Sequence, residues 1–258
     1  MDIPSTENMD SATPGCAVIL GATSALAQAV ARKLIEEGNS LMLVARDASK
    51  LEVVAADLEL RAGDSVSIQA QVVDLADTET HEKLIDSTNA AESYWLFYGS
   101  LPDQESCASD WSQMENALNV NFTSAASLLG RAANVFEERR GGSLVVVSSV
   151  AGDRGRQSNY AYGTAKGALS LYCQGLRNRL HASGVQVLTV KPGFIDTPMT
   201  EDVPKTPGIL WAKPERVARD IVHAQKRGKD VLYTPWFWLF IMLIIRTVPE
   251  RIFKRLSL

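Results

Sequence analysis

Tyr162 and Lys166 stand four residues apart within residues 159–182, a stretch whose pattern predicts one long helix. Residues at that spacing share a helix face, so the phenol and the ammonium can reach one ligand. A nearby cation stabilises phenolate and lowers the pKa of a tyrosine from about 10 toward the range of an acid–base catalyst. Tyr160 has Thr164 at the same spacing and is set aside. The pair is therefore a candidate proton-transfer site, although the spacing alone also arises by chance.

Two further groups follow neighbouring predicted strands. Ser148 and Ser149 end the β-branched run 144–149, and Lys191-Pro192-Gly193 follows the run 185–190. The proline and glycine predict a rigid turn with exposed amides, and Thr197 adds a hydroxyl beside it. Each group also has a structural explanation, because a serine can satisfy loop backbone and a Pro-Gly pair can simply end a strand.

Small residues follow the first predicted strand, residues 16–20. Gly21, Thr23, Ser24, Ala25 and Leu26 would let backbone approach a pyrophosphate at the start of an Ala-rich helix. The positive end of the helix dipole favours an anion there. An ordinary strand-to-helix turn has the same composition, so these residues alone leave both interpretations open.

The next two strand ends extend this pattern. Arg46 follows residues 41–45, where an enzyme using NAD would usually carry an acid, and it offers a planar cation for a 2′-phosphate. Asp74, with Leu75 after it, follows the stretch 66–73 and either accepts a hydrogen bond from an adenine amine or caps a helix. Three strand ends that each suit one part of a dinucleotide favour a nucleotide site.

Strands and helices alternate along the chain. Strands are predicted at 16–20, 41–45, 66–73, 94–98, 144–149, 185–190 and 230–233. Helices are predicted after the first strand as far as residue 37, at 49–61, after the cap Asp77, at 110–138 as two helices, at 159–182 and at 214–226. This order predicts a doubly wound α/β fold, a Rossmann-like parallel sheet with helices on both faces. Residues 16–258 form one domain by this interpretation, preceded by a polar leader at 1–15.

Composition excludes several classes of protein. The net charge of −4 argues against a nucleic-acid partner. Cys16, Cys107 and Cys173 lie far apart, with no Cys-x-x-Cys and no adjacent His pair, which predicts reduced thiols and no metal site. The leader lacks a secretory signal, so a cytoplasmic location is expected.

The C-terminal segment 235–258 is apolar and then basic. Its apolar run, 236–245, is too short to cross a bilayer, and it precedes Arg246, Arg251, Lys254 and Arg255. Two interpretations stay open: a helix that covers the substrate cleft or a subunit partner, and a segment that contacts the inner face of the membrane.

The sequence resembles the short-chain dehydrogenases/reductases in a set of residues that occur in the same order along the chain: the small-residue turn, Asp74, Asn121, Ser149, Tyr162, Lys166 and Pro192-Gly193. The resemblance implies that Tyr162 protonates a carbonyl while a nicotinamide delivers hydride. It further implies that Lys166 binds the nicotinamide ribose and lowers the pKa of Tyr162, that Ser149 holds the carbonyl oxygen, and that Asn121 supports a water relay. The cofactor site would comprise Gly21, Thr23, Ser24, Ala25, Leu26, Arg46, Asp74, Leu75, Gly99, Tyr162, Lys166, Pro192, Gly193, Ile195 and Thr197, with NADP(H) preferred over NAD(H).

Two elements depart from the family pattern. Ala25 and Ala27 replace later glycines of the turn, and Leu96-Phe97-Tyr98-Gly99 replaces an Asn-Asn-Ala-Gly element. The added methyl groups narrow the approach to the pyrophosphate, and the lost asparagines remove side-chain ties behind the cofactor. Neither departure touches the acid–base group.

Residues 152–156, 160–167 and 248–256 resemble a branch of this family that reduces a keto-sugar on a polyprenyl phosphate. A lipid-linked carbonyl substrate follows from that resemblance, with Arg154 and Arg156 as candidates to receive its phosphate. A soluble ketone or aldehyde substrate and a non-catalytic dinucleotide-binding sensor or scaffold are the alternatives. Pairing into a homodimer or homotetramer through helices 112–138 and 159–182 is expected by the same resemblance.

Overall fold

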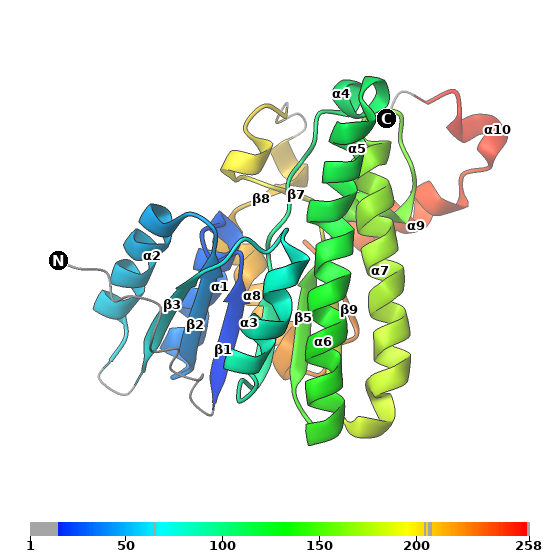
Figure 1. The fold of residues 1–258 in the computed structure, drawn as a ribbon. Coiled ribbons are helices and arrows are strands. Elements are labelled where there is room, and N and C mark those ends of the chain that lie inside the picture. The colour runs from blue at the N-terminus through cyan, green and yellow to red at the C-terminus, as the bar shows by residue number, and fades with distance from the viewer. Residues whose placement is uncertain (1–14, 64–65, 204, 206–207, 257–258) are drawn as a thin grey trace.

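The computed structural model describes residues 15–63, 66–203, 205 and 208–256 (Figure 1). Apart from Gly15, the predicted leader lies outside the described residues. Seven strands form one parallel sheet in the order β3-β2-β1-β4-β5-β6-β9. Their bounds are β1 Cys16–Leu20, β2 Ser40–Ala45, β3 Ile68–Val72, β4 Ser93–Leu96, β5 Ser143–Val147, β6 Gln186–Pro192 and β9 Val231–Thr234. The predicted doubly wound Rossmann-like fold is confirmed.

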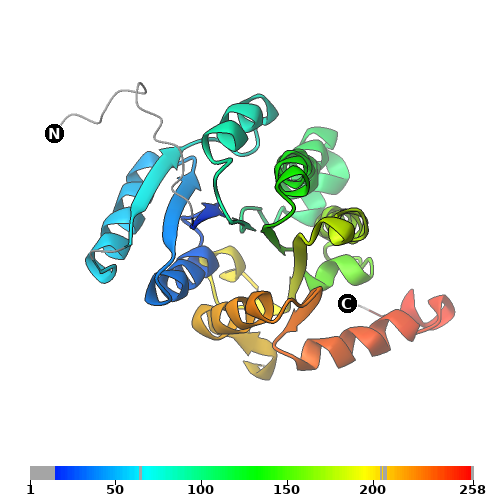
Figure 2. The same ribbon diagram turned by 90° about the horizontal axis from the view of Figure 1, so that it is seen from below.

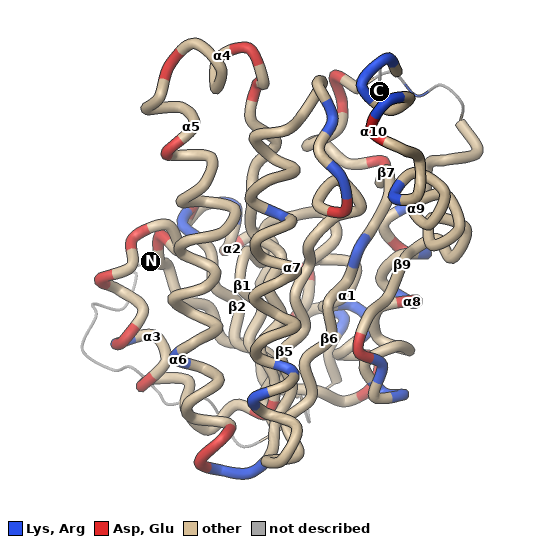
Figure 3. The backbone as a smooth tube through the Cα atoms, turned by 90° about the vertical axis from the view of Figure 1, so that its right-hand side faces the viewer, with Lys and Arg blue, Asp and Glu red and all other residues tan. Residues whose placement is uncertain are grey.

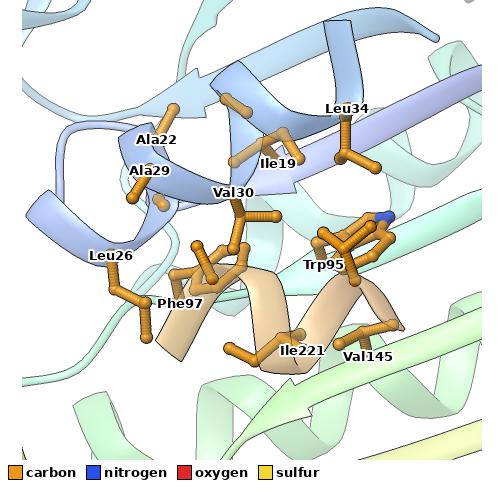
Figure 4. Packing of buried hydrophobic residues seen from close by; sticks show 14 of the residues in the cluster. Ile19, Ala22, Leu26, Ala29, Val30, Leu34, Trp95, Phe97, Val145 and Ile221 are labelled. Atoms are coloured by element: carbon orange, nitrogen blue, oxygen red, sulfur yellow. The ribbon is translucent and has the colours of Figure 1, made fainter. Parts of the chain in front are cut away.

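Helices cover both faces of this sheet (Figure 2). Their bounds are α1 Ala25–Glu36, α2 Ala48–Arg61, α3 His81–Ser87, α4 Gln104–Ser109, α5 Trp111–Leu118, α6 Ser124–Arg139, α7 Tyr160–Leu180, α8 Pro214–Lys226, α9 Phe237–Thr247 and α10 Glu250–Phe253. One buried cluster joins the sheet to α1, α2 and α8, and a second joins it to α3, α6 and α7. In the first, Val30 and Ile221 from two helices meet Trp95 and Phe97 (Figure 4).

The predicted elements agree with the observed ones to within a few residues, with four differences. A two-stranded sheet, β7 Phe194–Ile195 with β8 Trp211–Ala212, and the short helix α4 were not predicted. The two helices expected within 110–138 are α5 and α6, joined without a loop by a π-helical turn, Asn119–Thr123. Asp77 caps a short 3₁₀ turn, Thr78–Thr80, and α3 follows directly.

The C-terminal segment leaves β9 at the carboxyl end of the sheet and forms α9 and α10, drawn orange to red (Figures 1 and 2). Trp238 and Met242 are buried against Val150, whereas the opposite face of α9 is exposed. Lys and Arg residues, drawn blue, are frequent in and around α10 (Figure 3). Among the described residues, no helix is long and apolar enough to cross a membrane.

Candidate active site

A cavity of about 400 Å³ opens at the carboxyl ends of β1 to β4. It is lined by seven of the residues predicted for the cofactor: Gly21, Thr23, Ser24, Arg46, Asp74, Leu75 and Gly99. Gly21 has φ +84°, and a Cβ at this position would lie 2.7 Å from the Tyr98 nitrogen. Only glycine therefore fits this turn, which keeps the start of α1 close to β4. Ser24 caps α1 by accepting from the Ala27 amide at 3.2 Å.

Two charged residues, Arg46 and Asp74, line the cavity. Arg46 is exposed, and no hydrogen bond or ion pair of its side chain is found among the described residues. Asp74 accepts from the Ala76 amide at 3.0 Å, so its carboxylate shapes the turn as well as facing the cavity. Leu75 is buried behind it. A cavity with a glycine cradle, a free guanidinium and a carboxylate fits a phosphorylated dinucleotide.

The two serines at the end of β5 have different partners. The Ser148 hydroxyl donates to the Lys166 carbonyl oxygen at 2.8 Å and lies 2.7 Å from the Ser170 hydroxyl, so it is used in packing α7. The Ser149 hydroxyl accepts from the Ala151 amide at 3.1 Å and is hydrogen-bonded to the Tyr162 side chain. The hydroxyl beside Tyr162 is thus that of Ser149.

Lys166 lies near both Tyr162 and the cavity residue Gly99. Its Nζ is 5.8 Å from the centre of the Tyr162 ring and donates to the Val147 carbonyl oxygen at 3.1 Å. A Cβ built on Gly99, which lines the cavity, would lie 3.4 Å from this Nζ and 2.8 Å from Asn121 Oδ1. Gly99 is therefore the point at which the cavity, Lys166 and Asn121 meet.

Asn121 lies in the π-helical turn and is buried. Its Nδ2 donates to the Ala117 carbonyl oxygen at 2.9 Å, and its Oδ1 accepts from the Ser100 amide at 3.1 Å. Single π-helical turns interrupt α-helices frequently at functional sites, because the extra residue redirects side chains. Here the turn brings a helix side chain to the end of β4.

Burial dominates the protonation of this site. It raises the pKa of Tyr162 to about 12, opposed by the hydrogen bond with Ser149. Burial also lowers the pKa of Lys166 to about 8. Loss of hydration is the largest cause of the shift in the pKa of Tyr162, and Lys166, with Nζ 5.8 Å from the ring centre, is not among its causes. That Lys166 lowers the pKa of Tyr162 stays a prediction. At neutral pH the phenol holds its proton.

Backbone amides of the turn after β6 donate hydrogen bonds to other parts of the chain. The Gly193 amide donates to the Thr234 carbonyl oxygen at 3.0 Å, and the Asp196 amide to that of Ala212 at 2.9 Å. The Thr197 amide donates to the Thr200 hydroxyl at 3.3 Å. The prediction of exposed amides is wrong at these three positions, because β9 and β8 accept from Gly193 and Asp196 and the Thr200 hydroxyl accepts from Thr197.

The aromatic ring of Trp238, in α9, covers the same turn. A Cβ on Gly193 would lie 1.9 Å from Trp238 Nε1 and 2.0 Å from Cε2. Pro192 ends β6, and Ile195 belongs to β7 and to the buried core beside α1 and α8. A cofactor contact of these residues and of Thr197 remains a prediction, as it does for Ala25 and Leu26.

Arg154 binds the C-terminal segment. Its Nη1 donates to the carbonyl oxygens of Ile245 at 2.7 Å and Val248 at 2.6 Å, and its Nη2 pairs with Glu250 at 2.9 Å. The guanidinium carbon lies 3.7 Å from the centre of the Phe253 ring. These contacts occupy the group, so the expectation that Arg154 receives a substrate phosphate is wrong.

The departures from the family pattern are accommodated by packing. Ala27 is fully buried, and its methyl lies within the core between α1 and the sheet. Phe97 packs in the same core, while the Tyr98 hydroxyl lies 3.2 Å from that of Ser124. Tyr98 thus connects β4 to α6, where the family element would use amide side chains.

Several cavity residues were not predicted: Ala45, Val73, Ala76, Phe97, Tyr98, Ser100, Asn116 and Val120. Ala45, Val73, Phe97 and Tyr98 lie at the carboxyl ends of predicted strands, so the strand-end rule could have found them if it had included the last residues of each strand. Asn116 and Val120 lie in α5 and the π-helical turn, and only the tertiary packing brings them to the cavity.

Sequence comparison matches residues 15–208 to the family described as short chain dehydrogenase. The chain belongs to the short-chain dehydrogenases. It is 34% identical over 252 residues to the uncharacterized oxidoreductase Rv2073c of Mycobacterium tuberculosis, covering 96% of this chain and 99% of that protein. An uncharacterized oxidoreductase of Streptomyces coelicolor is also 34% identical, with 95% and 97% covered.

Solved structures of short-chain dehydrogenases share this fold. One from Sphingobium yanoikuyae in complex with NADPH has a TM-score of 0.80 at 21% identity and covers 92% of this chain and 97% of its own. One from Burkholderia cenocepacia in complex with NADP has a TM-score of 0.80 at 19% identity, with 95% and 98% covered. As a short-chain dehydrogenase, the protein is an oxidoreductase that uses a nicotinamide dinucleotide.

Proposed function

We propose that this short-chain dehydrogenase reduces a carbonyl to an alcohol with NADPH. One observation supports the proposal most: Gly99, which lines the cavity, lies beside Lys166, Lys166 Nζ is 5.8 Å from the centre of the Tyr162 ring, and Tyr162 is hydrogen-bonded to Ser149. A dinucleotide site therefore adjoins a protonated phenol that has a hydroxyl partner. A sensor or scaffold would need only the first of these.

The nicotinamide, when bound, supplies the hydride. Tyr162 gives its proton to the developing alkoxide, since burial keeps the phenol protonated at neutral pH. Ser149 donates a hydrogen bond to the same oxygen and limits its position. Lys166 and Asn121 hold the ribose end of the site and return a proton toward Tyr162 from the side of Gly99.

Transfer of isotope tests the reaction directly. With NADPH deuterated at the transferable C4 position and a panel of ketones and aldehydes, the product alcohol should carry deuterium on the former carbonyl carbon. Cofactor oxidation without labelled alcohol would contradict carbonyl reduction. Cofactor binding without oxidation across the panel would favour the sensor.

The preference for NADP(H) rests on Arg46, the cation in the cavity wall. A charge-assisted hydrogen bond is worth about 1.5–3 kcal/mol when desolvated, and the exposure of Arg46 places its contribution at the lower end, roughly tenfold in affinity. Calorimetry should show NADPH binding tighter than NADH, and Arg46→Ala should remove the difference. Equal affinities in the unaltered protein would contradict this assignment.

A lipid-linked substrate is the finer part of the proposal. Segments 152–156, 160–167 and 248–256 resemble decaprenylphosphoryl-2-keto-pentose reductase. The structure adds an exposed apolar face on α9, formed by Leu239, Phe240, Leu243 and Ile244, with exposed Trp236 immediately before the helix. Arg246, Arg251, Lys254 and Arg255 are exposed next to it. An apolar helix face flanked by cations suits an anionic membrane surface.

Co-sedimentation with vesicles of phosphatidylglycerol and phosphatidylcholine tests this contact. Phe240→Glu should reduce binding, whereas Leu60→Glu, a matched change at an exposed leucine of α2, should not. Binding that is absent, or that survives Phe240→Glu, would leave a soluble ketone or aldehyde as the favoured substrate. Loss of a dimer in Phe240→Glu would assign the face to a second subunit.

Pairing through α6 and α7 is the proposed mode of oligomerisation. These two long helices lie side by side on one face of the sheet (Figure 1). Leu171, 68% exposed in α7, offers an apolar contact there. Light scattering should show a dimer or tetramer that Leu171→Glu dissociates; a monomeric unaltered protein would contradict the proposal.

A further inference from the structure

A buried ion pair joins the loop after β5 to the strands β6 and β9. Asp153 Oδ1 accepts from Lys191 Nζ at 2.5 Å, and the two side chains are 3% and 9% exposed. Asp153 Oδ2 accepts from the Tyr233 hydroxyl at 2.7 Å. Burial and, after it, the Asp153 carboxylate raise the pKa of Tyr233, so at neutral pH the phenol keeps the proton that it donates. Each oxygen of Asp153 is therefore bound to a different strand.

Stability alone does not explain this pair. Burial of a carboxylate and an ammonium costs about as much free energy as their attraction returns, and apolar residues of similar volume often stabilise a core equally well. What the two charges add is direction, because a hydrogen-bonded pair in a buried site holds one geometry. The geometry that depends on Asp153 is that of the turn to which it belongs.

This turn begins at the serine of the acid–base site. The 3₁₀ turn Val150–Asp153 is capped by the Ser149 hydroxyl, which accepts from the Ala151 amide at 3.1 Å. The Gly152 amide donates to the Ser149 carbonyl oxygen at 3.2 Å. Asp153 is only four residues after Ser149. A displacement of the carboxylate therefore moves the turn that holds the serine.

The same turn packs closely against α7, the helix that carries the tyrosine and lysine of the site. A Cβ on Gly152 would lie 2.5 Å from the Gly167 nitrogen, and a Cβ on Gly163 would lie 2.9 Å from the Ala151 carbonyl oxygen. The glycines allow this approach but have no side chains that could hold the turn in one orientation. Asp153 supplies directional contacts to the sheet, so the turn is held from both α7 and the strands.

We propose that Asp153, bound by Lys191 and Tyr233, is a positioning residue that keeps the Ser149 hydroxyl directed at the reacting carbonyl oxygen. The inference rests on the proposed carbonyl reduction and adds residues that act on it through Ser149. A displacement of about 1 Å near reacting groups can cost about 10²-fold in rate. Removal of one donor to the developing oxyanion costs about 10²–10³-fold, which sets the ceiling for an effect that acts through the serine.

Hydrogen exchange tests the positioning of the turn without turnover. Asp153→Ala/Lys191→Met, the anchor variant, removes the pair without leaving an unpaired buried charge. Its control, Glu37→Ala/Lys226→Met, removes an ion pair of 2.8 Å that joins the ends of α1 and α8. In the full chain with NADP⁺, peptides covering residues 150–153 should exchange about tenfold faster in the anchor variant and at the unaltered rate in the control. Unchanged exchange in the anchor variant, or faster exchange throughout the chain, would overturn the proposal.

A double-mutant cycle tests whether the anchor acts through Ser149. Single-turnover reduction of a ketone by saturating NADPH is measured for the anchor variant, for Ser149→Ala and for their combination. The anchor variant should react about tenfold to 10²-fold more slowly with unchanged affinity for NADPH. Added to Ser149→Ala, the same changes should slow the reaction by less than about twofold. Equal slowing in both backgrounds would indicate a general structural defect and overturn the proposal.

Tyr233→Phe provides a milder test that does not depend on the folding of the anchor variant. It keeps the ion pair, removes one hydrogen bond to Asp153, and should slow the reaction by about threefold to tenfold only when Ser149 is present. Slowing that is independent of Ser149 would contradict the proposal. If the unaltered protein reduces no carbonyl, the proposed function fails, whereas the exchange data still decide whether Asp153 holds the turn.

Discussion

Replacing Gly193 by alanine should release α9 from the site. The added Cβ would lie 1.9, 2.0 and 2.5 Å from three atoms of the Trp238 ring, where ordinary contacts are 3.4–4 Å. The ring must therefore move by more than an ångström. Trp238 is buried and meets Phe194 edge to face at 5.5 Å between centroids, so it has no free space nearby.

Two limits bound the loss in the free energy of unfolding that Gly193→Ala causes. Overpacking a core costs about 1–3 kcal/mol when neighbours adjust slightly. Complete loss of a buried tryptophan, about 200 Å² at 25 cal/mol/Å², sets a ceiling near 5 kcal/mol. Since this overlap is severe but the ring lies on a terminal helix, we expect Gly193→Ala to lower the free energy of unfolding by about 2–4 kcal/mol.

Urea denaturation of four proteins measures the effect: unaltered, Gly193→Ala, Trp238→Ala and the double variant. Trp238→Ala alone should cost about 3–5 kcal/mol, and Gly193→Ala should add almost nothing to it. Gly175→Ala is the control, because a Cβ there meets nothing within 4 Å. The reasoning is refuted if Gly193→Ala costs less than about 0.5 kcal/mol, or costs the same with and without Trp238.

Three further changes probe the remaining contacts. Burial lowers the pKa of His81. The neutral imidazole therefore contributes stability above the unfolded-state pKa of about 6.5, and this contribution is lost as the pH falls below that value. Between pH 7.5 and 5 the urea midpoint of the unaltered protein should drop more than that of His81→Gln, and equal drops would contradict this. Gly99→Ala, whose Cβ would lie 2.8 Å from Asn121 Oδ1, should lower kcat and cost about 1–3 kcal/mol, whereas Gly141→Ala, with open space, should do neither. Arg154→Ala should speed hydrogen exchange across residues 246–256, and Arg251→Ala should not; equal exchange would show that the arginine does not hold the segment.

Local patterns predict much of this fold because its elements are long and regularly buried. Residues 16–20 are apolar throughout and form β1 with the predicted bounds, and Pro214 marks the start of α8. The two-residue strands β7 and β8 carry no period that a sequence can show. The π-helical turn at Asn119–Thr123 depends on an extra residue in a helical ladder, which no residue type announces.

The residues of the candidate site likewise differ in whether the sequence alone predicts them. The strand-end rule predicts Gly21, Arg46 and Asp74, and all three line one cavity. Contacts between distant segments are not predictable in this way: Trp238 meets a glycine 45 positions earlier, and the partners of Arg154 lie more than 90 positions away. The pKa of a tyrosine depends on such packing, because burial competes with every nearby charge.

The proton donor is the central claim, and single-turnover kinetics tests it most directly. Enzyme saturated with NADPH is mixed rapidly with a reducible ketone, and cofactor oxidation is followed for the unaltered protein, Tyr162→Phe and Tyr160→Phe. Tyr162→Phe should bind NADPH as before and react about 10²-fold more slowly or worse, the usual size of general acid catalysis. Tyr160→Phe, at an exposed tyrosine two residues earlier, should react at the full rate. An unchanged rate in Tyr162→Phe would contradict the account.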